Sequence, residues 1–316
     1  MGMRTKSLAE VSKLTEETAR QYLESLLWPE GPVCPHCKSK NATRVAGLSG
    51  RPGLLMCNDC RNQFTVTVGT IFEDSHIPLR SWIIAFQMMC ASKKGVSAKQ
   101  VQRQLGLGSY KSAWFMCHRI RYAMTEGPMA GMLKGTVEAD ETYVGGKPRP
   151  GTGPHKRGRG TKKAPVVALV ERGGNVRTKV VASVSHRNLR QFVDKNICKS
   201  ATVNTDEFNT YIGLLKNHAR HDVVNHGLKQ YARHNADGTV SHCNTAESFF
   251  SLLKRGVYGA FHHISKKHLP RYCDEFSFRW NRRGMTDGER TEAGLKNVAG
   301  KRLMYQQPAK MFAEAA

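Results

Sequence analysis

Apolar residues recur with a helical period in four stretches of the first 130 residues. After Thr15, a candidate N-cap, the apolar positions predict a helix that ends at "WPEGP". From Leu79, the stretch "LRSWIIAFQMMCASKK" predicts an apolar helix. Ser97 is placed to cap a short helix that runs through Leu105, and Ser109 to cap a longer one beyond a glycine turn. This part of the chain is therefore predicted to be mainly helical.

After Gly135 the apolar period changes to that of strands. Strands are predicted at "TVEADETYV", "VVALVE" and "VRTKVVASV", then a helix from Asn188 to about Cys198 and a short strand in "ATVNTDEF". A later stretch, "NTAESFFSLLKRG", is an amphipathic helix whose Phe249 and Leu253 lie on its apolar half. Strands and helices in this order predict a mixed α/β domain.

Four cysteines stand between the first helix and the apolar helix. They form a C-x2-C pair, nineteen residues and a second C-x2-C pair: Cys34, Cys37, Cys57 and Cys60. Thiolates at this spacing suit a structural Zn²⁺ site with four cysteine ligands. The alternatives are two unrelated thiol pairs or a redox dithiol, and the latter lacks its usual βαβ context. The other cysteines are expected to be small buried hydrophobes.

Basic residues far outnumber acidic ones. Lys and Arg total 49 against 25 for Asp and Glu, a net charge of +24. This balance indicates a polyanionic partner, with nucleic acid favoured over a membrane surface. We find no apolar run of membrane-spanning length and no signal peptide in "MGMRTKSLAE". We therefore expect a soluble, intracellular protein with no membrane partner.

The short helix, glycine turn and longer basic helix fit a helix-turn-helix motif. On the second helix, Lys111, Arg119 and Arg121 are candidates for DNA contact. The alternative is an ordinary helical hairpin in which Trp114 and Phe115 fill a core. The charge balance favours the DNA-contacting interpretation.

A glycine- and proline-rich basic stretch separates the first two strands. "GGKPRPGTGPHKRGRGTKKAP" is too polar to fold alone, and we predict a loop that orders on a phosphate backbone. The alternative is a solvated turn. The candidate DNA contacts here are Lys156, Arg157, Arg159, Lys162 and Lys163.

Three carboxylates occupy strand or helix positions in this basic domain. Asp140 lies in the first strand, Asp206 at the end of "VNTD", and Glu247 on the amphipathic helix. Carboxylates gathered at a sheet edge can hold two Mg²⁺ ions for phosphoryl transfer, whereas without cations they repel one another. Spacing alone leaves the assignment open, because Glu138 shares a strand face with Asp140. Glu141 and Glu207 also adjoin the two Asp residues.

Four motifs carry a resemblance to a known family. "VEADETYVGGK", "VNTDEFNTY", "VVNHGLKQY" and the long stretch from "NTAESFF" to "FRWNRR" resemble the DDE transposases of bacterial insertion sequences. More narrowly, they resemble group fifteen ninety-five, whose members join a zinc ribbon to a ribonuclease-H-like catalytic domain. The similarity extends from about Thr15 to Arg283.

The resemblance implies the site. Asp140, Asp206 and Glu247 match the metal-binding triad for two Mg²⁺ ions, for which Mn²⁺ can substitute, and Lys254 matches a family lysine seven residues after the third acid. Some relatives carry Asn at that third position. Lys254 and Arg255 are expected to contact DNA, and Arg271 either to contact DNA phosphates or to pack inside the protein. The implied reaction is cleavage at the ends of the element, followed by joining of 3′-hydroxyl ends to target DNA.

The predicted fold class is a multidomain α/β protein with an N-terminal zinc ribbon and helix-turn-helix, then a ribonuclease-H-like mixed-sheet catalytic domain. The predicted segments are an N-terminal helix (1–30), zinc ribbon (31–75), helical DNA-binding segment (76–132), catalytic domain (133–290) and C-terminal tail (291–316). The expected partner is double-stranded DNA, namely terminal inverted repeats and target DNA, bound by a homodimer or higher oligomer in the bacterial cytoplasm and nucleoid.

Two rival functions remain. One is a ribonuclease-H-fold nuclease or junction resolvase that uses the same metals without strand transfer. The other is a zinc-ribbon DNA-binding regulator, or a domesticated transposase, that binds DNA without cutting it. Repeats that flank the gene would distinguish a transposase from the first rival. The absence of metal-dependent nicking would identify the second.

Overall fold

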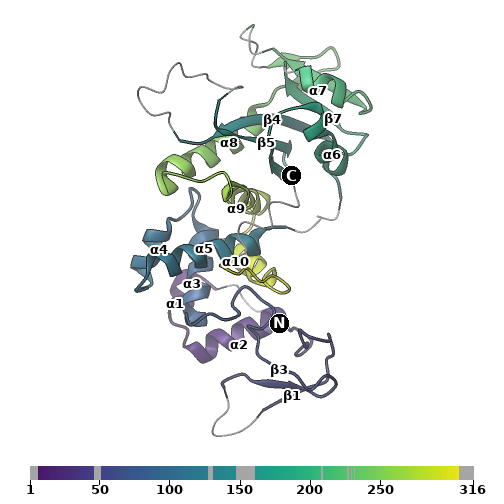
Figure 1. Ribbon diagram of the computed structural model, residues 1–316. Coiled ribbons are helices and arrows are strands. Elements are labelled where there is room, and N and C mark those ends of the chain that lie inside the picture. Colours follow the sequence, from purple (N-terminus) through teal and green to yellow (C-terminus); the bar gives the residue numbers. More distant parts are fainter. Residues whose placement is uncertain are drawn as a thin grey trace. The chain divides into compact units, whose positions relative to one another are not determined.

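The computed structural model describes residues 6–45, 51–126, 131–146, 161–207, 209–225, 228, 230 and 232–305. These residues form two compact units (Figure 1). The first contains the described chain up to Thr125 and again from Arg282, and the second contains the part from Glu126 to Asn281.

The first unit is built on six helices of the described chain. They are α1 (Leu8–Ser12), α2 (Glu16–Leu27), α3 (Leu79–Ala91), α4 (Ala98–Gln104), α5 (Tyr110–Met124) and α10 (Asp287–Lys296). Thr15 caps α2 as predicted, since its hydroxyl accepts the N–H of Thr18 at 3.2 Å. The α10 helix packs against α3 and also contacts α2 and α5. The chain thus returns to this unit after completing the second one.

The α4 and α5 helices form the predicted helix, turn and helix. The hydroxyl of Ser97 caps α4 by accepting the N–H of Gln100 at 3.1 Å. Gly106 adopts φ of +63° in the turn, a conformation that glycine adopts without steric cost. Ser109 holds the N-cap position of α5, although its side chain makes no capping hydrogen bond.

A small antiparallel sheet in the first unit forms the zinc-ribbon fold. Its strands are β1 (Ala42–Arg44), β2 (Leu55–Cys57) and β3 (Gln63–Phe64), with β2 in the centre. Leu55 and Phe64 are buried together with two of the cysteines. An apolar cluster this small leaves most of the stabilisation of the ribbon to its cysteine cluster.

The second unit is organised by a five-stranded mixed sheet. Its strands are β4 (Thr136–Val144), β5 (Ala164–Glu171), β6 (Val176–Val180), β7 (Thr202–Asp206) and β8 (Arg220–Val224), in the order β6-β5-β4-β7-β8. The β4 strand pairs antiparallel with β5 and parallel with β7. This mixed sheet is of the ribonuclease-H-like kind, and the predicted fold class is confirmed.

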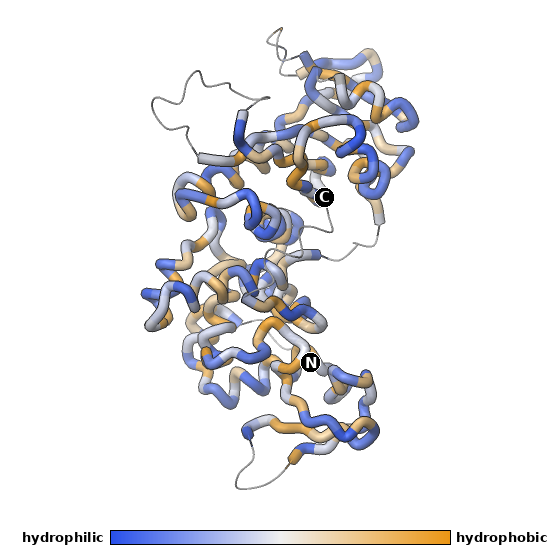
Figure 2. Tube along the Cα trace, viewed as in Figure 1, coloured by the Kyte–Doolittle hydropathy of each residue, from blue (hydrophilic) through white to orange (hydrophobic). Residues whose placement is uncertain are grey.

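Helices cover both faces of this sheet. Val137, Ala139 and Val167 pack on one side with α6 (His186–Asn196) and α7 (Asn209–Leu214). On the other side, Val144 and Val166 pack with α8 (Asn244–Gly256) and α9 (Leu269–Asn281). Hydrophobic and hydrophilic residues alternate along many elements (Figure 2). Successive side chains of a strand point to opposite faces, so β5, which is covered on both faces, is buried from Ala164 to Val170 without interruption.

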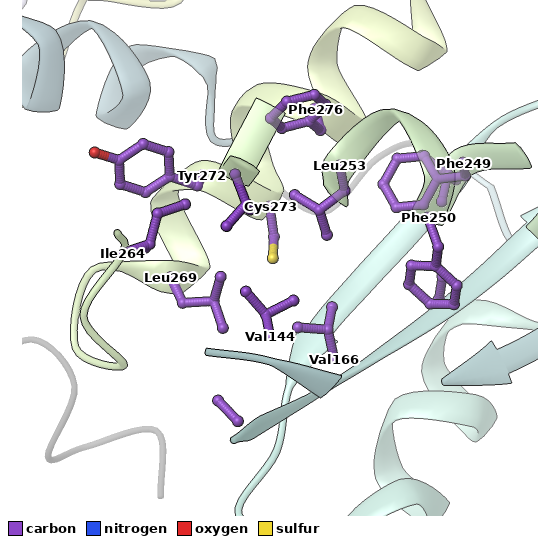
Figure 3. Packing of buried hydrophobic residues seen from close by; sticks show 14 of the residues in the cluster. Val144, Val166, Phe249, Phe250, Leu253, Ile264, Leu269, Tyr272, Cys273 and Phe276 are labelled. Atoms are coloured by element: carbon purple, nitrogen blue, oxygen red, sulfur yellow. The ribbon is translucent and has the colours of Figure 1, made fainter. Parts of the chain in front are cut away.

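The face that α8 covers is tightly packed. Phe249, Phe250 and Leu253 of α8 point toward Val144 and Val166 of the strands, alongside side chains from α9 (Figure 3). The predicted apolar half of this helix is therefore the half that packs. A π-helical turn, η2 (Val257–Phe261), continues α8, and a short hairpin of β9 (Arg233–His234) and β10 (Val240–Ser241) precedes it.

Candidate functional site

The end of the central strand pair gathers carboxylates. Ala139 of β4 is paired with Thr205 of the parallel neighbour β7, so Asp140 and Asp206 reach the same end of the sheet. One carboxylate oxygen from each of Asp140, Asp206 and Glu141 lies within 4.8 Å of the others. The carboxyl ends of parallel strands are a usual place for a site in an α/β sheet.

Asp140 is the most electrostatically perturbed member of this cluster. The pKa of Asp140 is raised to about 7, and burial is the largest cause. The backbone N–H of Glu141 donates a 2.7 Å hydrogen bond to Oδ1 of Asp140, which lowers the pKa and partly opposes this rise. The negative charges of Glu141, Asp206 and Glu247 also raise it. A carboxylate in this state gains most from a bound cation, which would replace the proton.

Glu141 is a member of the cluster that sequence reasoning did not select. Its Oε2 accepts a 3.1 Å hydrogen bond from the buried hydroxyl of Tyr211 on α7. Burial, then the charges of Glu141 and Asp140, raise the pKa of Tyr211 well above its usual value, so the phenol remains a donor. The only signal for Glu141 in the sequence was that it adjoins Asp140.

The α8 helix carries Glu247 on its exposed side, opposite the packed Phe249 and Leu253. Glu247 is close enough to contribute to the raised pKa of Asp140. Lys254 and Arg255 are also exposed, and Arg255 donates a 2.9 Å hydrogen bond to the hydroxyl of Ser251. Glu247 and Lys254 thus lie two turns apart on the polar half of the helix.

Glu138, the alternative to Asp140, has different surroundings. Its side chain is completely buried, and it accepts hydrogen bonds from the backbone N–H groups of Thr245 and Ala246 at 2.7 and 3.0 Å. The carboxylate therefore faces the first turn of α8.

The carboxylate cluster suits a hard divalent cation. Mg²⁺ prefers oxygen ligands at about 2.1 Å in octahedral geometry, which places ligand oxygens about 3 to 4 Å apart. The carboxylate oxygens of the cluster, which all lie within 4.8 Å of one another, are close to this spacing. Asp140, Asp206 and Glu141 are the residues that could hold such an ion.

The four predicted cysteines come together in the ribbon. All four Sγ atoms lie within 4.8 Å of one another, with Cys34 and Cys60 at 3.7 Å and Cys37 and Cys57 at 3.5 Å. A tetrahedron with zinc–sulfur bonds of 2.3 Å has edges of about 3.8 Å, so the cluster fits Zn²⁺. A hydrogen bond from the backbone of Asn62 is the largest cause that lowers the pKa of Cys60 to about 6.

Among the residues that the structure describes, these two clusters are the only groups of three or more potential ligands close enough to share an ion. His242, Cys243 and the histidines at 262, 263 and 268 belong to neither cluster. His262 and His263 are exposed, whereas His268 is buried.

Three of the predicted DNA-contacting arginines are buried instead. The exposed fractions of Arg119, Arg121 and Arg271 are 6%, 1% and 4%. Burial lowers the pKa of Arg119, whose Nη2 donates to the carbonyl of Glu73 at 2.8 Å and whose Nε donates to Leu303 at 3.2 Å. In this structure these three guanidinium groups are therefore not presented at the protein surface.

The remaining predicted DNA contacts divide into two groups. Lys111 and Lys162 are exposed and Lys163 is half-buried, so these ammonium groups are available to phosphates. The Nζ atom of Lys111 lies 4.4 Å from the ring centre of Tyr305. Lys156, Arg157 and Arg159 lie outside the described residues.

Within the described part of the chain, no helix combines the length and the apolar character that crossing a membrane requires.

Comparisons with known proteins agree with this geometry. A family model described as the ISXO2-like transposase domain matches residues 132–281, and one described as the transposase zinc-ribbon domain matches residues 14–63. A protein of Halobacterium salinarum, described as an uncharacterized protein in the transposable element ISH50, is 30% identical over 279 residues. That alignment covers 84% of this chain and 91% of the relative. No solved structure gives a significant match.

Proposed function

The chain belongs to the IS1595 family of transposases, and from this premise we propose the reaction that it performs. It binds the terminal inverted repeats of its element, cleaves DNA at the element ends and joins the 3′-hydroxyl ends to target DNA. No covalent bond between protein and DNA is needed, so the reaction requires no Ser or Tyr nucleophile.

The carboxylate cluster at the ends of β4 and β7 carries this proposal. Asp140, Asp206 and Glu247 are the proposed metal ligands, and the proximity of Glu141 makes it an additional candidate. Two Mg²⁺ ions, or Mn²⁺ in their place, would supply Lewis-acid activation of the attacking oxygen and stabilisation of the leaving one. The protein fixes three of the carboxylates on adjacent strands, so little reorganisation is required at the moment of reaction.

The surroundings of the cluster support phosphate binding. Lys254 projects from the exposed side of α8, two turns from Glu247, and we assign to it a contact with a phosphate beside the scissile bond. Arg255, Lys162 and Lys163 of this unit, and separately Lys111 of the first unit, are the described cations proposed to bind the DNA backbone. Because two DNA ends must be joined to one target, at least a dimer is expected on DNA.

The test uses labelled DNA from both flanks of the gene and a target plasmid, with and without Mg²⁺. Wild type should nick and join, while Glu247→Gln and Asp206→Asn bind the ends without reacting. Equal cleavage by Glu247→Gln would mean that another carboxylate is the third ligand. Nicking without joining would favour the nuclease or resolvase, and sequence-specific binding that is unaffected by Asp206→Asn, with no nicking, would favour the regulator.

A further inference from the structure

The first turn of α8 is capped from outside the helix. Its N-cap residue, Cys243, makes no side-chain capping bond. Instead, Oε2 of Glu138 on β4 accepts the N–H groups of Thr245 and Ala246 at 2.7 and 3.0 Å. The hydroxyl of Thr245 donates to Oε1 of the same carboxylate at 2.9 Å. A negative charge at this position also complements the positive end of the helix dipole.

A guanidinium completes this arrangement. Nε of Arg172 donates to Oε1 of Glu138 at 2.7 Å, while its other nitrogens donate to the carbonyls of Val240 and His242 at 2.8 and 2.9 Å. The carboxylate of Glu138 is completely buried and the Arg172 side chain is 26% exposed. Arg172 therefore ties both the carboxylate and the segment that leads into α8 to the sheet.

Glu138 lies near a proposed metal ligand on each of two elements, Asp140 on β4 and Glu247 on α8. Asp140 is two residues further along the same strand face, about 7 Å away at a strand rise of 3.3 Å per residue. Glu247 is the residue that follows Ala246, whose N–H Glu138 accepts. One buried carboxylate thus links the strand that carries Asp140 to the helical turn that carries Glu247.

We propose that Glu138 is a positioning residue for metal binding, because its cap on α8 sets the place of Glu247 relative to Asp140. This inference rests on the proposed function, which assigns both residues as ligands. Phe249 and Leu253 already hold the body of α8 on the sheet, so the cap acts mainly on the first turn. Groups that orient metal ligands without binding the ion typically change metal affinity or activity 10–100-fold when they are altered.

The decisive variant is Glu138→Gln, which keeps the shape but loses the charge that faces Arg172. Its matched control is Glu275→Gln, since Glu275 is equally buried on α9 and pairs with Arg279. A milder variant, Thr245→Val, keeps the backbone bonds and removes only the hydroxyl donor. It keeps the proposal testable if Glu138→Gln does not fold.

Two measurements avoid any dependence on catalysis. Amide hydrogen exchange without added Mg²⁺ or Mn²⁺ should show faster exchange at Thr245 and Ala246 in Glu138→Gln than in Glu275→Gln. A Mn²⁺ titration followed by electron paramagnetic resonance should show about 10- to 100-fold weaker binding in Glu138→Gln. Thr245→Val should shift Mn²⁺ binding in the same direction by a smaller factor, and Glu275→Gln should bind as wild type does.

Wild-type Mn²⁺ affinity together with slow first-turn exchange in Glu138→Gln would overturn the positioning role. The same loss of Mn²⁺ affinity in Glu275→Gln would also overturn it, because general destabilisation would then be the cause. A wild-type protein that binds Mn²⁺ but never cuts DNA would contradict the proposed function while the effect of Glu138 on Mn²⁺ binding persists.

Discussion

Arg119 donates a 2.8 Å hydrogen bond from Nη2 to the backbone carbonyl of Glu73, inside the first unit. Its guanidinium also lies 5.0 Å from the ring of Phe115 on its own helix. A buried guanidinium with carbonyl and aromatic partners stabilises the packing of the unit, and in this arrangement it is withheld from DNA.

Arg119→Met should therefore lower the free energy of unfolding, while the DNA affinity of the folded protein changes little. The substitution leaves the carbonyls of Glu73 and Leu303 without this donor, at an expected cost of about 2–4 kcal/mol in the free energy of unfolding. Denaturant unfolding followed by tryptophan fluorescence measures this cost.

The matched variant is Lys111→Ala on the exposed side of the same helix. It should cost less than about 1 kcal/mol in stability, yet weaken DNA binding and reduce the salt dependence of the affinity by about one phosphate contact. If Arg119→Met kept wild-type stability and lost DNA affinity, the predicted DNA contact of Arg119 would be restored.

The zinc site makes a second prediction. The purified protein should contain one Zn²⁺ per chain, and chelation should release it and expose four titratable thiols. Cys57→Ser should lose the metal and lower the melting temperature, because binding free energy at a structural zinc site is folding free energy. Cys198→Ser, which removes a partly exposed cysteine of the second unit, is the control and should retain zinc. The zinc site would be contradicted if chelation left the wild-type protein free of metal and its melting temperature unchanged.

The fold was predictable where local patterns are strong. The limits of β4 and α8 agree with the stretches "TVEADETYV" and "NTAESFFSLLKRG" because period and turn residues mark both ends. The ribbon followed from cysteine spacing alone. The strand β8 and the short hairpin β9–β10 were not predicted, since neither has a long alternating pattern of its own.

The site was less predictable than the fold. That Asp140 and Asp206 meet depends on the parallel pairing of β4 with β7, which is a non-local contact. Glu138 and Asp140 share a strand face and look equivalent in sequence, and only the tertiary position of the α8 N-terminus separates a capping carboxylate from a candidate ligand. The burial of Arg119 likewise depends on partners at residues 73 and 303. The division into five segments remains a prediction.

The return of the chain to the first unit makes a third prediction. Gly294 on α10 packs so closely on α3 that an added Cβ would lie 3.3 Å from the ring of Phe86 and 3.6 Å from Sγ of Cys90. Gly294→Val should therefore cost about 1–3 kcal/mol through overpacking. Lys296→Val introduces the same side chain at an exposed position of α10 and should cost less than about 1 kcal/mol. Equal unfolding midpoints for the two variants would show that α10 does not pack there.

The raised pKa of Asp140 makes a fourth prediction, about the protein without added Mg²⁺ or Mn²⁺. Its folded pKa of about 7 lies above the usual 3.8, so the folded protein holds this proton more tightly than the unfolded chain. The resulting stabilisation is complete below about pH 4 and is lost as the pH rises to 7, by at most about 4 kcal/mol. Asn cannot ionise, so Asp140→Asn should become progressively more stable than wild type over this range while losing DNA cleavage.

Scanning calorimetry from pH 4 to 8, with bound zinc retained, measures that difference. Asp194→Asn is the control: Asp194 is a surface carboxylate that pairs with Lys199 at 3.0 Å, and its replacement should leave the pH dependence nearly unchanged. Adding Mn²⁺ should stabilise wild type at pH 8 and have less effect on Asp140→Asn, because the cation then balances the charge that the proton balances at low pH. The prediction would be contradicted if the difference in stability between Asp140→Asn and wild type were constant from pH 4 to 8. The pKa of Asp140 would then not be raised, and the carboxylates of the cluster would not repel one another.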